Sequence, residues 1–266
     1  MKQLSFFFLM ILASFGFLSG QSLDDVLANH AKASGYDHLS SVKTTRIKGV
    51  TMRGTMEVPF TILTKGDKIR YESDMQGRKM IQVFDGTQGW FISPRSGEVR
   101  EMPARLVQMI KERSKLGGPL ESWKEIRDNL TLEGKDDMDG KPVYKIKYTR
   151  GRGVVTRFFI DVNDYLLLKS STRMNYNGRD LNRLVSYDEY KNVEGVMIPF
   201  VRKTRMEGVS GTPGQGARAG KRGTRQAARG SDRGPAGGQG EIRFTKVEFN
   251  VPVDDNLFTK ESLTGK

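Results

Sequence analysis

The sequence contains no cysteine and only two histidines, His30 and His38. A chain without cysteine has no disulfide bond, no thiolate nucleophile and no lipid-modified cysteine. Two histidines alone are too few for the usual zinc and transition-metal sites, where His and Cys supply most ligands. The Gly-x-Ser-x-Gly pattern of many serine hydrolases is also missing. We therefore expect no metal site and no cofactor, and we predict that the protein is not an enzyme.

Long apolar runs are scarce, and the one that stands out lies at the N-terminus. Lys2 is followed by uncharged, mostly apolar residues at 4–18 and then by the small residues Ser19 and Gly20. This pattern is typical of a secretory signal peptide. The run is shorter than the roughly 20 residues that a membrane-spanning helix needs. We predict a signal peptide at 1–20 and an exported, soluble mature chain at 21–266, forming one domain without a lipid anchor.

Acidic and large apolar residues are nearly absent from a segment at about 208–240. It holds 11 of the 30 glycines, with Val209 and Asp232 as its only large apolar and acidic residues. Such a composition buries too little apolar surface to offset the entropy lost on ordering, so we predict a disordered insertion. Its six basic residues are Arg218, Lys221, Arg222, Arg225, Arg229 and Arg233.

Two interpretations of this basic insertion stay open. It is either a solvated hairpin tip, or an arm whose six basic residues contact an anionic membrane surface or lipopolysaccharide. The segment contains no aromatic side chain on which a nucleotide base could stack, and export also argues against nucleic acid as a partner.

Two amphipathic helices are predicted. The first begins after Ser22, which forms a capping-box pattern with Asp25, and ends at Gly35. The second begins at Pro103 and ends at the pair Gly117-Gly118. Each helix has one apolar face, so we expect both to pack inside a curved sheet.

Most of the remaining sequence alternates between apolar and polar residues. Between 55 and 62, for example, Met56, Val58, Phe60 and Ile62 share one face of a strand. Turn signals such as Asp139-Gly140 separate about ten such strands. The fold class predicted is mainly β. A single curved antiparallel sheet would form an incomplete β-barrel with an apolar interior and a helical lid.

Several motifs follow one another in a characteristic order, at 35–37, 84–90, 139–144, 198–200 and 251–258. In this order the chain resembles the LolA/LolB lipoprotein-carrier superfamily, in particular its periplasmic outer-membrane lipoprotein-sorting branch. The resemblance implies a periplasmic, monomeric carrier whose open barrel binds lipid or lipoprotein acyl chains without catalysis. The side chains expected to line its interior are Phe60, Ile62, Tyr71, Met80, Phe84, Trp90, Tyr144 and Ile146. The alternative is that these side chains simply fill a core.

The chain departs from this superfamily in two places, the basic insertion at about 208–240 and the end of an early strand. Many carriers have Arg-Pro near the end of an early strand, and that arginine helps to latch the lid, whereas this chain reads Thr64-Lys65-Gly66-Asp67. Lys65 is therefore the candidate latch, although it lacks the planar fork of arginine. A second function stays open, namely a lipid-sensing regulatory or protein-interaction module of RseB type. The sequence has no second domain of the kind found there.

Overall fold

The computed structural model describes residues 21–93, 96–176, 179–208 and 239–264. The predicted signal peptide lies outside these ranges, and so do the six basic residues of the insertion. Within the described residues, no helix is both long enough and apolar enough to cross a membrane.

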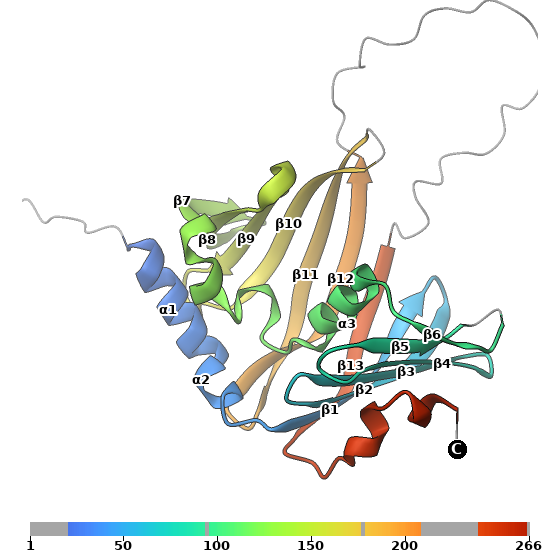
Figure 1. Cartoon of the computed structure of the whole chain (residues 1–266). Coiled ribbons are helices and arrows are strands. Elements are labelled where there is room, and N and C mark those ends of the chain that lie inside the picture. The colour runs from blue at the N-terminus through green and yellow to red at the C-terminus, as the bar shows by residue number, and fades with distance from the viewer. Residues whose placement is uncertain (1–20, 94–95, 177–178, 209–238, 265–266) are drawn as a thin grey trace, which may run out of the picture.

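The strands of the described residues form one antiparallel sheet of thirteen strands, in the order β6-β5-β4-β3-β2-β1-β13-β12-β11-β10-β9-β8-β7. Pairing of β1 with β13 joins its two halves, while β6 and β7 remain at the two edges. The sheet is strongly curved but not closed (Figure 1), which confirms the predicted incomplete barrel. The strand bounds are β1 Thr44–Arg53, β2 Met56–Lys65, β3 Lys68–Met75, β4 Arg78–Phe84, β5 Gly89–Ile92, β6 Val99–Glu101, β7 Leu130–Met138, β8 Lys141–Thr149, β9 Val155–Asp161, β10 Leu167–Tyr176, β11 Arg179–Val193, β12 Val196–Gly208 and β13 Gln239–Phe249.

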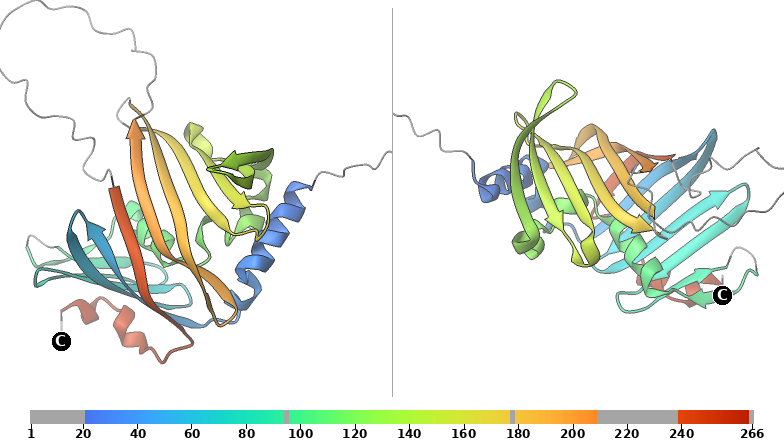
Figure 2. Two further views of the ribbon diagram at one scale, coloured as in Figure 1. Left: turned by 180° about the vertical axis from the view of Figure 1, so that it is seen from behind. Right: turned by 90° about the horizontal axis from the view of Figure 1, so that it is seen from above.

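Within the described part of the chain, three α-helices lie at the rim and on the inner side of this curve. Both predicted helices are confirmed, as α1 (Leu23–Ser34) and α3 (Ala104–Ser114), and a short α2 (Tyr36–Leu39) follows α1. Figures 1 and 2 show α3 and the segment after it inside the curve of the sheet. The described ranges also contain five 3-10 turns, namely η1 Gly118–Leu120, η2 Trp123–Asn129, η3 Gly151–Gly153, η4 Asp255–Phe258 and η5 Glu261–Leu263.

Helix α1 has the predicted signals at both ends. The Ser22 hydroxyl accepts a hydrogen bond from the Asp25 amide at 3.1 Å, and the Asp25 carboxylate accepts one from the Ser22 amide at 3.0 Å. Gly35 ends the helix at φ +69, and a Cβ there would lie only 2.0 Å from the carbonyl oxygen of Gly195. This close approach fixes the end of α1 against the β11–β12 turn.

We expect Ser22→Ala to lower the free energy of unfolding by about 1 kcal/mol, because it removes the acceptor of the N-cap. Urea denaturation followed by circular dichroism measures this change. Ser22→Asn, which keeps a capping oxygen, should stay close to wild type. Equal losses in both variants would contradict a capping role.

The buried side chains form three clusters. Helix α1 packs Val26 and Leu27 on the inner face near Phe158 and Ile160 of β9. Helix α3 packs Ile110 on the inner face of β2–β4, which carries Phe60 and Phe84. The outer face of β4 and β5 is covered by the C-terminal segment, where Phe258 and Leu263 pack near Val83. Strands β4 and β5 are therefore covered on both faces.

Candidate functional site

The inner face of the sheet brings most of the predicted lining residues together. Phe60, Ile62, Tyr71 and Phe84 lie in the cluster beneath α3, each no more than 8% exposed. Met80 is on the same side of β4 as Phe84, and its sulfur accepts a hydrogen bond from Gln82 Nε2 at 3.6 Å. The first four form one apolar wall of β2, β3 and β4, and Met80 lies on the same side of the sheet.

The other three predicted lining residues lie elsewhere. Tyr144 and Ile146 belong to the second cluster, beneath α1. Trp90 lies on the outer face, where it packs against the cluster of Val83 and Phe258. Pairing of Phe84 with Gly89 explains this position, because the glycine takes the inward place on β5 and the next residue points outward.

An aromatic row crosses the inner face from β3 to β12. Its rings follow one another with centroids 6.0 Å apart for Tyr71 and Phe60, 6.3 Å for Phe60 and Phe244, and 6.2 Å for Phe244 and Phe200. Gly49 of β1 makes room for it, since a Cβ there would lie 2.7 Å from the Phe60 ring. Phe200 and Phe244 were not predicted as lining residues, although Val196, Ile198 and Phe200 alternate as they do in the other strands.

Helix α3 and the segment 115–121 cover this aromatic row as a lid. Ile110 is the only buried residue of α3, at 1% exposed, while Leu106 and Val107 are partly buried. Met109 on the same helix is 41% exposed. Helix α3 itself is thus held to the sheet by a small apolar contact, while Leu116 and Leu120 of the segment after it are buried.

Arg202 of β12 also holds the lid. Its Nη2 donates a hydrogen bond to the carbonyl oxygen of Leu116 at 3.2 Å, and its Nε is buried without a hydrogen-bond partner. Burial lowers the pKa of this guanidinium from its ordinary value. Lys65, the latch candidate, instead reaches the C-terminal segment, where its Nζ lies 2.6 Å from Asp255 Oδ2.

A chain of polar contacts joins α1 to the lid. The Nδ1 of His30 lies 2.7 Å from the carbonyl oxygen of Tyr165, and its Nε2 lies 3.0 Å from the hydroxyl of Tyr36. That hydroxyl donates to the carbonyl oxygen of Gly117 at 2.5 Å. Burial lowers the pKa of His30 to about 4 and raises the pKa of Tyr36. Both side chains are therefore neutral at pH 7.

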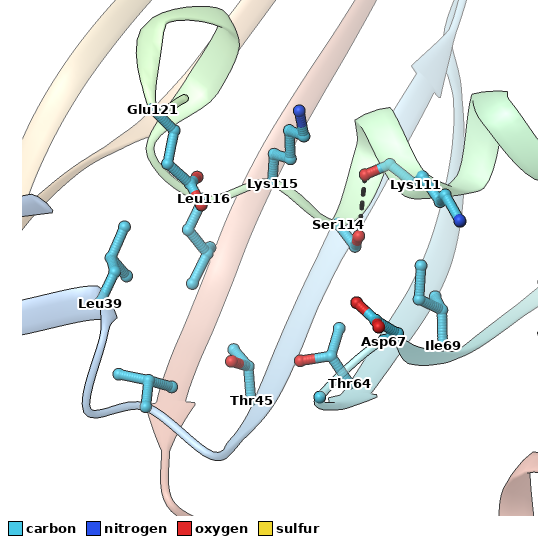
Figure 3. Close-up of a pocket in the computed structure, with 12 residues that line it drawn as sticks. Leu39, Thr45, Thr64, Asp67, Ile69, Lys111, Ser114, Lys115, Leu116 and Glu121 are labelled. Carbon is cyan, nitrogen blue, oxygen red and sulfur yellow. Dashed lines mark hydrogen bonds between the residues drawn. The ribbon is translucent and has the colours of Figure 1, made fainter. Parts of the chain in front are cut away.

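A cavity of about 310 Å³ opens between the lid and the ends of β1–β3 (Figure 3). Figure 3 places Leu116 and Glu121 on one side of it, and Thr64 and Ile69 on the other. The Glu121 carboxylate accepts a hydrogen bond from the Gly117 amide at 2.9 Å, and burial raises its pKa. In the described ranges, no group of three or more histidine and acidic side chains is placed to hold a metal ion.

A larger hollow of about 960 Å³ lies on the outer face of β11–β13. Charged side chains of both signs line much of it, and several of them are paired. Arg243 Nε lies 2.5 Å from Glu241 Oε1, and Lys203 Nζ lies 4.0 Å from Asp188 Oδ2. The outer hollow is therefore a surface of compensated charge, unlike the apolar inner face.

An open antiparallel sheet curved around an apolar inner face, with a helix across that face, defines the class of LolA-like half-barrels. Solved structures with this fold include a LolA superfamily protein from Nitrosomonas europaea, with a TM-score of 0.52 and 12% identity over 91% of this chain and 100% of that one. An outer membrane lipoprotein-sorting protein domain from Vibrio parahaemolyticus has a TM-score of 0.53 and 12% identity over 91% and 97% of the two chains. A DUF1329 family protein from Desulfovibrio piger has a TM-score of 0.54 and 13% identity over 90% of this chain and 98% of that one.

These likenesses confirm the LolA-like fold that the order of motifs indicated. No protein-family model matches the sequence, and no curated protein matches it either.

Proposed function

We propose that this protein binds acyl chains of lipids or lipoproteins on its inner face and carries them through the periplasm, in outer-membrane lipoprotein sorting. The observation that carries the proposal is the aromatic row, which lies beneath α3, a helix with a single buried side chain, Ile110. Burying a methylene group contributes about 0.8 kcal/mol, so a wall of apolar side chains suffices to hold an acyl chain. Such binding needs no reactive group.

The lid must move for this binding to occur. The cavity of about 310 Å³ is at the lower end of the ~300–1,000 Å³ range of small-molecule pockets. An acyl chain of full length therefore has to displace α3 and occupy the place of Ile110 against the aromatic row. The fold neighbours support the same class of function, because one is named for the LolA superfamily and another for outer membrane lipoprotein sorting.

Native mass spectrometry of the full chain, expressed with its N-terminus and purified from the periplasm, tests the proposal. We expect discrete mass additions of acylated molecules. Met80→Lys should reduce them, because this half-buried side chain is on the inner side of β4. Ile81→Lys is the matched control, since the neighbouring side chain is also half-buried but packs against the C-terminal segment. A clean apo mass that also resists loading with a lipopeptide would refute acyl binding.

A further inference from the structure

The ion pairs of the described residues are distributed unevenly over the two faces of the sheet. On the outer face, Lys65 and Lys68 both pair with Asp255, Arg157 pairs with Glu133, and Lys246 pairs with Glu248. Other pairs join residues of hairpin ends or exposed helix positions, such as Arg100 with Glu98 and Arg127 with Asp24. Several basic residues of the outer surface thus have acidic partners.

Four basic side chains of the inner face differ from these. Each lies over a ring of the buried aromatic cluster, and none has a carboxylate within 4.0 Å among the described residues. These inner cations are Lys111 at 4.3 Å from the ring centre of Phe84, Arg113 at 5.5 Å from Tyr71, Lys191 at 4.4 Å from Phe200 and Arg202 at 5.1 Å from Phe244. Three of these four rings belong to the aromatic row, so positive charge follows the row along its length.

The acidic groups near the inner cations compensate this charge poorly. Glu121 is the carboxylate that acts on Arg202, but it accepts the Gly117 amide, and burial raises its pKa, which favours its neutral form. Asp67, at the mouth of the cavity, is exposed. Arg113 and Lys191 are exposed, but Lys111 and Arg202 are partly buried, and a cation that is partly removed from water without a counter-ion is unfavourable. The buried Nε of Arg202 has no hydrogen-bond partner among the described residues.

We propose that the inner face selects anionic amphiphiles, with the acyl chain along the aromatic row and the negatively charged headgroup bound by the inner cations. The inference rests on the proposed acyl binding and adds the charge of the cargo. A phosphate or carboxylate oxygen accepts strong hydrogen bonds from ammonium and guanidinium groups, and these bonds are stronger where water is excluded. An anionic headgroup would supply the counter-charge that the inner face lacks.

The test uses the delipidated mature chain and two probes with the same single acyl chain, anionic lysophosphatidylglycerol and zwitterionic lysophosphatidylcholine. Displacement of the neutral dye N-phenyl-1-naphthylamine reports the affinity of each. The variant is Lys111→Gln with Arg113→Gln, both at accessible positions of α3. Its matched control is Arg105→Gln, an exposed residue of the same helix without a ring contact. Circular dichroism confirms that each variant is folded.

We expect the wild-type protein to prefer the anionic probe, and the double variant to bind it about tenfold more weakly while its affinity for the zwitterionic probe, whose phosphate charge is balanced by its own ammonium group, falls much less. Arg105→Gln should behave as wild type. Equal weakening for both probes would overturn headgroup selection but leave acyl binding in place. Displacement of the dye by glycerol phosphate alone would overturn it too, since the site would then bind small anions. Failure of both lipids to displace the dye from wild type would refute acyl binding itself.

Discussion

Replacing Ile110 with aspartate should detach α3 from the inner face while the thirteen-stranded sheet stays folded. Ile110 is 1% exposed and is the only buried residue of its helix. Burying one aliphatic side chain contributes about 1.5–3 kcal/mol, whereas burying an unpaired carboxylate costs more than that contact supplies. The state of lower free energy is therefore the one in which the helix leaves the sheet and exposes the aspartate to water. The sheet does not depend on α3 for its strand pairing, so its hydrogen bonds remain.

Hydrogen exchange and dye binding measure this release. We expect fast amide exchange at 104–114 with protection retained in β2–β4, and stronger binding of an apolar dye to the uncovered aromatic row. Met109→Asp is the matched control, because the neighbouring side chain is 41% exposed and should accept a charge without moving the helix. A cooperative loss of the whole far-UV signal in Ile110→Asp would mean that α3 is part of the core and not a lid.

The regular parts of this fold could be read from local signals in the sequence. Ser22, Asp25 and Gly35 bound α1 because capping and the left-handed conformation of glycine act within a few residues. The alternation in β2 and β3 placed Phe60, Ile62 and Tyr71 on one face for the same reason, since the period of a strand is two. The three-residue strand β6 is too short for such a pattern and was missed.

The features that were missed depend on contacts between distant segments. Phe200 and Phe244 enter the aromatic row through the pairing of β12, β13, β1 and β2, which no local window contains. Arg202 contacts Leu116, 86 residues away in sequence. The position of Trp90 follows from the C-terminal segment, which buries the outer face of β4. Ile81 and Val83 point to one face of β4 and Phe84 points to the other. Apolar residues on both sides of the strand indicate that both of its faces are covered.

Acid should destabilise the protein through His30. Its pKa is about 6.5 in an unfolded chain and is lowered by burial to about 4 in the folded one. The unfolded state therefore binds a proton below pH 6.5 that the folded state does not bind, and stability falls as the pH is lowered from 6.5 towards 4. By this linkage, protonation of His30 in the unfolded state alone lowers the free energy of unfolding by about 2 kcal/mol at pH 5 relative to pH 7. Tyr36, Ser34 and the carbonyl of Tyr165, which contact the ring, do not ionise in this window.

Urea denaturation at pH 7 and pH 5 measures the effect as a difference within each variant, so that any loss of packing cancels. We expect His30→Gln to lose most of the acid dependence of wild type, and His38→Gln, at the other and exposed histidine, to keep it. The carboxyl of Asp255, whose ion pairs with Lys65 and Lys68 hold its pKa near 2, stays charged throughout this range. An unchanged pH dependence in His30→Gln would show that another group is responsible. If the pH dependence disappears in His30→Gln, protonation of His30 is the cause of acid destabilisation. The affected contacts would then be those of His30 with Tyr36 and of Tyr36 with Gly117, where α1 meets the lid.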